Sequence, residues 1–325
     1  MELNEFLAEW HNDNPRILVH TSGSTGKPKP LMVEKRRMLN SARITCDFLG
    51  LKPGDTALLC MPLDYIAGKM MVVRSLQRGL QLTTVRPSSH PLADETLPHF
   101  TFAAMVPMQV YNTLKVPCER ERLMRIRHLI IGGGAISDEL AQMIKPLPNA
   151  VWSTYGMTET LSHIALRRLN GPYASLWYTP FDGVGISLNA DGCLVIDAPE
   201  VCAEPLVTND IAQLRTDDRT GKTLFRIKGR KDNVVCSGGI KIQIEEVEET
   251  LRPHLSAPFM IVKKQDEMLG EKAILLTESA DLTHIEEICR NTLPKYWVPR
   301  EFLHIDHLPL TETGKPKRTL PFTPR

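Results

Sequence analysis

The segment Thr21-Ser-Gly-Ser-Thr-Gly-Lys-Pro-Lys29 follows a short apolar run, residues 17–20, that is typical of a β-strand. Its two glycines let the backbone approach a ligand closely, so that amides and hydroxyls can surround phosphate oxygens while lysines neutralise charge. The segment predicts a phosphate-binding loop, and a plain glycine- and serine-rich turn is the alternative. The predicted ligand-facing residues are Thr21, Ser22, Gly23, Ser24, Thr25, Gly26, Lys27 and Lys29.

This loop does not fit the Walker type of P-loop, Gly-x-x-x-x-Gly-Lys-[Ser/Thr]. Position 21 is Thr where that motif has Gly. Lys27 is followed by Pro28, which interrupts the helix start that the motif requires. We therefore expect another class of nucleotide-binding loop.

Outward from the loop, short apolar runs alternate with amphipathic segments as far as Gly156. Helices are expected at residues 34–49, 68–77, 109–114 and 138–144, and strands at 57–60, 82–85, 102–105, 128–131 and 151–154. This alternation predicts an α/β fold in which helices cover the faces of a mostly parallel sheet.

The pattern changes twice after Gly156. Turn signals such as Asn189-Ala-Asp-Gly192 separate short strands and predict a small β-rich subdomain attached to the sheet. From Gly229 on, expected helices at 244–251 and 285–292 alternate with expected strands at 259–262, 273–276 and 301–305. We therefore expect two domains, residues 1–229 and a small α+β domain of residues 230–325.

A second polar cluster, Ser153-Thr-Tyr-Gly-Met-Thr-Glu-Thr160, follows a predicted strand, where open α/β sheets bind ligands. Tyr155 can stack on a base, Thr158 can donate to a phosphate, and Glu159 can bind Mg²⁺, which prefers oxygen ligands. Gly133 and Gly134 end the preceding strand and would let a flat ring lie against the backbone. A tight strand-to-helix turn is the alternative reading of both segments.

Together these segments resemble the adenylate-forming superfamily of acyl-CoA synthetases, and the resemblance extends from Val19 to the C-terminus. Three later segments match it in order. The resemblance implies that Asp210 and Arg230 bind ribose, that Asp232 is a hinge, and that Gly238 and Gly239 lie beside the thiol tunnel. It also implies that Lys315, in Pro309-Leu-Thr-Glu-Thr-Gly-Lys315, is the adenylation lysine.

The same resemblance implies catalysis by Lys315, Thr158 and Glu159, with ATP, Mg²⁺ bound at Glu159, and CoA as co-substrate. The C-terminal domain would act as a mobile lid that rotates about Asp232 between the two half-reactions. Family members usually have a much longer segment before the phosphate loop, so the first domain is expected to be truncated at its N-terminus. Asp64 replaces a histidine-containing run of the family, which leaves the acid pocket undefined.

The substrate is suggested by the helix Gly68-Lys-x-x-x-x-Arg74, which, with the short chain, looks most like o-succinylbenzoate–CoA ligases of menaquinone biosynthesis. Arg74 or Lys69 could then pair with the second carboxylate of a diacid. The alternative is that both are solvated helix charges. Two other functions stay open: an adenylation enzyme that loads an aryl or amino acid onto a carrier protein, and a non-catalytic nucleotide-binding relative.

Composition adds limits to the possible partners. A net charge of +1 gives no electrostatic basis for binding nucleic acid or a membrane surface. No apolar run reaches membrane-spanning length, and the acidic start Met1-Glu-Leu-Asn-Glu5 is unlike a signal peptide. Seven cysteines without a Cys-x-x-Cys pair predict free thiols in the cytoplasm. We expect a monomer or homodimer that acts on small molecules.

Overall fold

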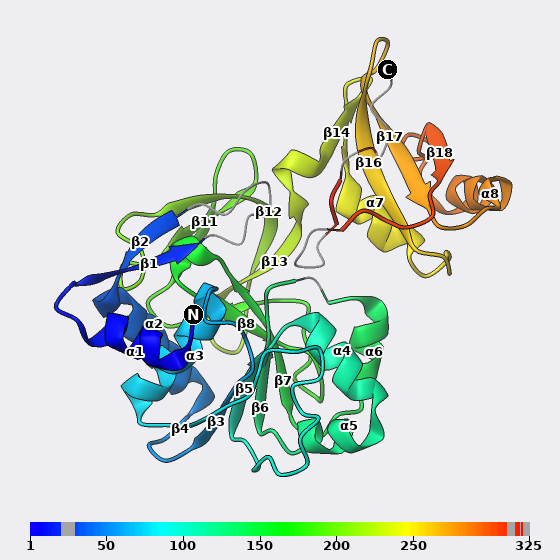
Figure 1. Ribbon diagram of the computed structural model, residues 1–325. Helices are drawn as coiled ribbons and strands as arrows, with labels where there is room; N and C mark the ends of the chain where they lie inside the picture. Colours follow the sequence, from blue (N-terminus) through cyan, green and yellow to red (C-terminus); the bar gives the residue numbers. More distant parts are fainter. Residues whose placement is uncertain (21–29, 135, 311–315, 319, 321–325) are drawn as a thin grey trace. The chain divides into compact units, whose positions relative to one another are not determined.

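The computed structural model describes residues 1–20, 30–134, 136–310, 316–318 and 320 (Figure 1). The chain forms two compact units. The first comprises Met1–Ile186, Ile196–Leu206 and Arg215–Phe225, and the second comprises Ser187–Val195, Val207–Leu214 and Arg226–Arg325. The functional boundary between residues 229 and 230 remains a prediction.

A seven-stranded sheet forms the centre of the first unit, in the order β4-β3-β5-β6-β7-β8-β9. The first five strands in this order pair in parallel, and β8 and β9 are added antiparallel. The predicted, mostly parallel sheet is therefore confirmed. The strands are β3 (Thr56–Leu59), β4 (Gln81–Thr84), β5 (Phe102–Met105), β6 (His128–Ile131), β7 (Ala150–Gly156), β8 (His163–Arg168) and β9 (Thr179–Pro180).

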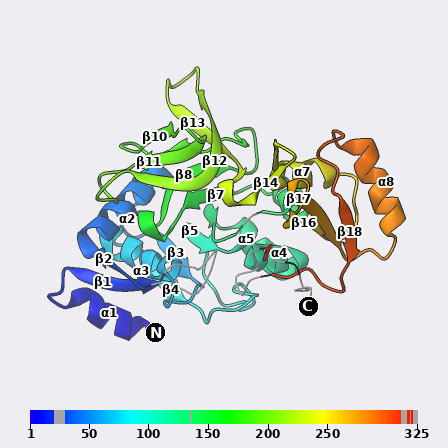
Figure 2. The same ribbon diagram turned by 90° about the horizontal axis from the view of Figure 1, so that it is seen from above.

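Helices lie beside this sheet, and Figure 2 shows α2 and α3 side by side next to β3. Both helices end at a glycine in the left-handed conformation, Gly50 with φ 65° and Gly79 with φ 67°, which residues with a Cβ adopt at a cost. Proline occupies the first turn of α4 and α5, where no amide is needed. The helices of this unit are α1 (Leu3–His11), α2 (Lys35–Leu49), α3 (Ile66–Arg78), α4 (Pro107–Lys115), α5 (Pro117–Met124) and α6 (Asp138–Ile144).

A separate two-stranded sheet flanks the predicted phosphate loop. Strands β1 (Arg16–His20) and β2 (Pro30–Glu34) pair antiparallel, with His20 opposite Pro30. Residues 21–29 therefore connect two strands of one hairpin, whereas a Walker loop leads from a strand into a helix. The topology supports the exclusion of the Walker class.

The expected β-rich region is present, although β8 and β9 of that region join the large sheet instead. Four strands form the separate sheet β10-β11-β12-β13. Its strands belong partly to each unit. They are β10 (Gly185–Leu188), β11 (Cys193–Asp197), β12 (Leu206–Thr216) and β13 (Thr223–Arg230).

The second unit contains the expected α+β arrangement. A sheet ordered β15-β14-β17-β16, with β18 parallel to β17, packs its apolar face against two helices, α7 (Ile244–Leu251) and α8 (Leu282–Thr292). Val247 and Ile285 from the helices are buried against Leu275 of the sheet. The strands are β14 (Val234–Ser237), β15 (Ile240–Gln243), β16 (Phe259–Asp266), β17 (Gly270–Thr277) and β18 (Glu301–His304).

Two further expectations concern the whole chain. All seven cysteines are free thiols, as predicted. Within the described ranges, no helix combines the length and apolar character that crossing a membrane requires.

Gly68 gives a test of this packing. A Cβ there would lie 2.3 Å from the carbonyl oxygen of Pro62, so Gly68→Ala should lower stability by about 1–3 kcal/mol through overpacking. Alanine normally stabilises a helix relative to glycine by about 1 kcal/mol. A loss of stability would therefore indicate overpacking at Gly68, and a gain would indicate that helix propensity dominates. Gly134→Ala is the control, because a Cβ added there would make only ordinary contacts with Pro107, at 3.5 Å and beyond. Urea unfolding midpoints would measure both, and a stabilising Gly68→Ala would contradict the packing.

Candidate active site

The turn after β7 carries two of the predicted catalytic residues. Thr158 is buried and Glu159 is exposed in a single 3₁₀ turn, η1 (Thr158–Thr160), at the carboxyl end of the strand. The chain then returns at once into β8. A Cβ on Gly156 would lie 2.2 Å from the carbonyl oxygen of Ser162, so only glycine allows this close return.

The glycine segment after β6 leaves the sheet at the same edge. Ile131 pairs with Ser153, so residues 132–134 and Tyr155 emerge from neighbouring parallel strands. A Cβ on Gly132 would lie 2.5 Å from the Thr154 hydroxyl oxygen, which donates to the Ile131 carbonyl at 3.2 Å. This edge is where open α/β sheets bind ligands.

Tyr155 belongs to an aromatic cluster. Its ring packs edge-on against Phe225 at 5.0 Å and tilted against Tyr178 at 5.8 Å, while Tyr178 and Phe225 stack at 5.3 Å. The Ser153 and Tyr178 hydroxyls are 2.9 Å apart and fix the second ring. The cluster holds Tyr155 in one orientation, as a base-stacking residue requires.

Both candidate substrate residues on α3 are buried, Lys69 at 3% and Arg74 at 2% exposure, so the alternative of solvated helix charges is wrong. Lys69 Nζ donates to the Leu18 carbonyl at 2.7 Å and thereby fixes β1, the strand before the predicted phosphate loop. Burial lowers the pKa of Lys69. Lys69 therefore has a structural partner already.

Arg74 has no carboxylate partner among the described residues. One of its terminal nitrogens donates to the Ser162 hydroxyl at 2.5 Å, another contacts the Met71 sulfur at 3.8 Å, and its Nε has no hydrogen-bond partner. Burial lowers the guanidinium pKa to about 10, so Arg74 stays charged at neutral pH. A buried cation without a counter-ion is costly, and it suits the binding of an anion.

A chain of hydrogen bonds extends from Arg74. The Thr45 hydroxyl donates to the Ser41 carbonyl at 3.0 Å, so it accepts from His163 Nε2 at 3.1 Å. His163 Nδ1 is then unprotonated and accepts from the Ser162 hydroxyl at 3.1 Å. Burial and the nearby Arg74 hold the pKa of His163 well below its usual 6.5, which keeps the ring neutral. The chain fixes the hydroxyl that faces Arg74.

In the second unit, three predicted residues lie together. Arg230 donates to Asp232 at 2.8 Å and lies 3.3 Å from an Asp210 carboxylate oxygen. Burial opposes the charge of Arg230, but the carboxylates of Asp232, Asp210 and Glu245 outweigh it and raise the guanidinium pKa. The predicted ribose-binding pair and the predicted hinge residue therefore form one charged cluster.

Gly238 and Gly239 form the turn between β14 and β15. Both have left-handed backbones, with φ 57° and 82°. The Gly238 amide donates to the Leu269 carbonyl at 2.8 Å, which fixes the turn against the loop before β17.

Some predicted residues lie outside the described part of the chain, namely Thr21 to Lys29 and Lys315. Among the described residues there is no group of three or more His, Cys, Asp or Glu that could hold a metal ion. Glu159 stands as a single exposed carboxylate with no ion-pair partner in the described ranges. Mg²⁺ often uses one or two protein carboxylates together with substrate phosphates, so this arrangement fits it.

Comparison with known proteins identifies the family. Residues 4–202, more than half of the chain, match the family described as AMP-binding enzyme. The chain belongs to the AMP-binding enzymes. It is an acyl-adenylate-forming ligase, and the predicted superfamily and enzyme class are confirmed.

Three known proteins are similar to this AMP-binding enzyme in sequence or in fold. A 2-succinylbenzoate–CoA ligase of Bacillus mycoides (strain KBAB4) is 25% identical over 339 residues, covering 94% of this chain and 69% of the relative. An AMP-forming acyl-CoA synthetase/AMP-acid ligase II-like protein of Dyadobacter fermentans is 33% identical, with TM-score 0.67 and coverage of 97% and 91%. The O-succinylbenzoate Coenzyme A Synthetase (MenE) of Bacillus subtilis, in complex with ATP and magnesium ion, has TM-score 0.73 at 23% identity, with coverage of 93% and 68%, and shows a shared fold.

The hydrogen-bonded residues around Arg74 were not predicted from the sequence. Ser162 and His163 follow the Tyr155–Thr160 segment after Leu161, and their polar character within an otherwise apolar run was a usable signal. Thr45 carried no such signal, because its partner His163 is 118 residues away.

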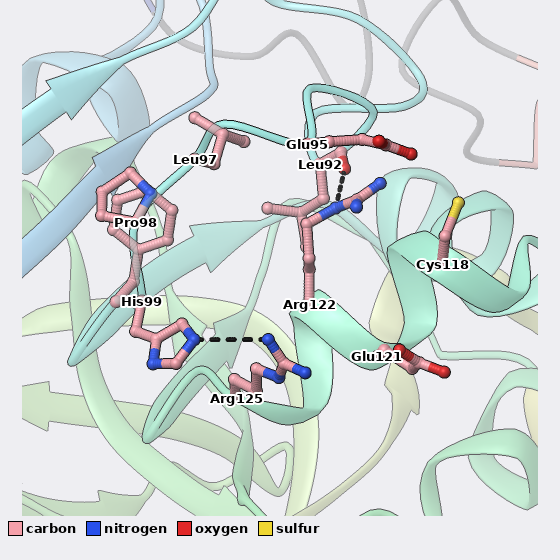
Figure 3. Close-up of a pocket in the computed structure, with 10 residues that line it drawn as sticks. Leu92, Glu95, Leu97, Pro98, His99, Cys118, Glu121, Arg122 and Arg125 are labelled. Atoms are coloured by element: carbon pink, nitrogen blue, oxygen red, sulfur yellow. Dashed lines mark hydrogen bonds between the residues drawn. The ribbon is translucent and has the colours of Figure 1, made fainter.

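A cavity of about 130 Å³ lies elsewhere in the first unit (Figure 3). It is bounded by residues 92–100 and by α5, and Arg122 Nε donates to the Leu92 carbonyl there at 2.7 Å. Phe100 and Arg125 line it shortly before β5 and β6 begin, so it lies at the amino ends of those strands. Of the predicted site residues, Gly133, Gly134, Tyr155, Thr158 and Glu159 lie at the opposite, carboxyl ends.

The neutral state of His163 predicts a pH dependence. The unfolded chain takes up a proton on His163 near pH 6.5, which the folded chain cannot do, so stability is lost as pH falls below that value. We expect a loss of about 1–2 kcal/mol from this residue between pH 7 and pH 5. His163→Gln should flatten the dependence, measured by urea unfolding at pH 5, 6, 7 and 8.

The stability of His163→Gln should still fall somewhat as the pH is lowered. Burial, Arg127 and Arg168 lower the pKa of His128 to about 4, so His128 also favours the unfolded state in acid. Equal slopes in His163→Gln and the unchanged protein would contradict the assignment.

Proposed function

We propose that this AMP-binding enzyme activates o-succinylbenzoate with ATP and transfers the acyl group to CoA, giving o-succinylbenzoyl-CoA. The observation that carries the choice of acid is Arg74, a buried guanidinium with no counter-ion among the described residues. It donates to Ser162, in the turn that contains Glu159. A substrate with a second carboxylate would supply that counter-ion. The relatives named 2-succinylbenzoate–CoA ligase support the same acid.

In the first half-reaction, a carboxylate oxygen attacks the α-phosphorus of ATP, and pyrophosphate leaves. Two anions must approach, so catalysis depends on positioning and charge neutralisation. We assign Lys315 and Thr158 to the α-phosphate, Lys27 and Lys29 to the β- and γ-phosphates, and the remaining residues of the 21–29 loop to phosphate contacts. Mg²⁺ bound at Glu159 would neutralise phosphate charge.

The nucleoside contacts are assigned to the residues that the family resemblance indicates. Tyr155 offers a fixed ring for the base, and Gly133 and Gly134 offer backbone that a flat ring can approach. Asp210 and Arg230 would bind the ribose hydroxyls. Since Lys69 already donates to the Leu18 carbonyl, we assign the second carboxylate of the acid to Arg74.

In the second half-reaction, the CoA thiol gives up its proton, its sulfur attacks the acyl carbonyl carbon, and AMP leaves. The lysine and the pantetheine arm need the same entrance, so we propose that residues 230–325 rotate about Asp232 between the steps. Gly238 and Gly239 would then border the thiol path.

The diacid assignment predicts a specific loss in Arg74→Gln. We expect kcat/KM for o-succinylbenzoate in ATP–pyrophosphate exchange to fall about 100-fold or more, since the second carboxylate loses its buried charge partner. Arg78→Gln is the matched control, because Arg78 lies one turn later on α3 and bonds the Leu51 carbonyl at 3.0 Å. Benzoate lacks the second carboxylate. Exchange with benzoate and none with o-succinylbenzoate would overturn the assignment.

If Lys315 acts only in adenylation, Lys315→Ala should affect the two half-reactions differently. Adenylation should fall by about 100- to 1,000-fold, as for loss of one positioned charge at a reacting group. Conversion of supplied o-succinylbenzoyl-AMP and CoA to thioester should persist. Lys317→Ala, two residues further on, is the control. Equal loss of both half-reactions would contradict the role of Lys315, and pyrophosphate release without CoA turnover would favour a carrier-protein acceptor.

A further inference from the structure

Thr160 lies directly after Glu159 in the turn between β7 and β8. Its side chain is 0% exposed, and its hydroxyl oxygen lies 3.0 Å from the Met157 carbonyl oxygen and 2.6 Å from that of Ser162. The Met157 amide donates back to the same hydroxyl at 3.0 Å. One buried hydroxyl therefore joins the two ends of the turn.

Leu161 shows that this turn is strained. Within the described residues it is the one non-glycine position with positive φ, at 65°. Such a backbone costs on the order of 1–3 kcal/mol and persists only where surrounding contacts enforce it. Here the Leu161 side chain is buried, its amide donates to the Thr158 carbonyl at 2.9 Å, and the Thr160 hydroxyl closes the turn.

Glu159 is anchored from a second side. The Cys202 thiol donates to the main-chain carbonyl of Glu159 at 3.5 Å. The segment before Cys202 is held by α2, where Arg37 donates to the Pro199 carbonyl and Asn40 to the Glu200 carbonyl, each at 3.0 Å. The Glu159 backbone is thus fixed while its carboxylate stays exposed.

We propose that Thr160 is a positioning residue that holds the Glu159 carboxylate in place for Mg²⁺ bound to ATP. The inference rests on the proposed function, in which Glu159 binds the metal. Mg²⁺ demands near-octahedral geometry. If the protein supplies only one carboxylate, a shift of that carboxylate weakens the whole protein contribution to the site. Residues that orient a metal ligand typically contribute 10–100-fold to metal affinity.

The test compares Thr160→Val, which keeps the shape and removes the hydroxyl, with Thr160→Ser, which keeps the hydroxyl. ATP dissociation constants are measured by isothermal titration calorimetry, once with Mg²⁺ and once with EDTA, without acid or CoA. In Thr160→Val we expect the gain in ATP affinity on adding Mg²⁺ to shrink about tenfold. The EDTA value should stay within about twofold, and Thr160→Ser should match the unchanged protein.

Thr277 provides a matched control. It is also 0% exposed, and its hydroxyl donates to the Pro258 carbonyl and accepts from the Ser279 amide, both at 3.1 Å. Thr277→Val removes the same kinds of bond, so it should cost similar stability and leave the effect of Mg²⁺ unchanged.

A double-mutant cycle with Glu159→Gln separates positioning from general damage. If Thr160 acts through the Glu159 carboxylate, Thr160→Val has no further effect on Mg²⁺-dependent binding once that carboxylate is gone. Additive effects would overturn the proposal.

Two other outcomes also decide it. An unchanged Mg²⁺ effect in Thr160→Val overturns this proposal alone, whereas absence of any Mg²⁺ effect in the unchanged protein overturns the metal role of Glu159 as well. If Thr160→Val does not fold, Thr160→Ala removes the same hydroxyl with a smaller side chain. It should likewise shrink the Mg²⁺ effect about tenfold, and an unchanged effect would refute the proposal.

Discussion

The close return of the chain after β7 is the constraint on which the candidate site depends. Gly156 lies so near Ser162 that a single added carbon would overlap its carbonyl oxygen. That approach forces a turn of only a few residues between two antiparallel strands, and the strain falls on Leu161. As a result, Thr158 and Glu159 lie at the carboxyl edge of the sheet on a backbone with little conformational freedom. Backbone strain of this kind is common at functional sites because a preorganised group does not need to be ordered during the reaction.

The same turn is connected to the charge buried in α3. Ser162 accepts from Arg74 and donates to His163, which leaves the imidazole neutral and its tautomer fixed. Removing a guanidinium from water without a carboxylate partner opposes folding, and below about pH 6.5 so does a histidine that cannot be protonated. A fold under selection for stability alone would replace both with apolar side chains of similar volume. Their arrangement in one hydrogen-bonded chain, whose Ser162 and His163 follow Glu159 closely in sequence, is consistent with a binding site for an anionic substrate group.

Much of the fold was readable from the sequence because its strands are short, apolar and bounded by turn residues. Strands β5 and β6 and helices α6 and α7 have the predicted bounds. Helix α5 was missed because its sequence, Pro-Cys-Glu-Arg-Glu-Arg-Leu-Met, lacks an apolar stripe, with only Glu119 and Leu123 buried. Strand β2 was missed because it runs without a break into α2. Strand β8 was not assigned to the large sheet, because antiparallel pairing to β7 leaves no local signal.

By itself, the sequence determined the family and predicted which residues form the nucleotide half of the site, because loops that bind phosphate and ribose need particular residues at fixed short spacings. It also placed Lys69 and Arg74 on one helix, but left open whether that face was solvated. Only the tertiary structure decided this, since the contacts that bury Lys69 and Arg74 come from Leu18, 51 residues before Lys69, and from Ser162, 88 residues after Arg74. The tertiary structure likewise distinguished Lys69, which has a carbonyl partner, from Arg74, which has no counter-ion in the described chain. Burial and charge pairing depend on which distant segments meet, and no local pattern records that.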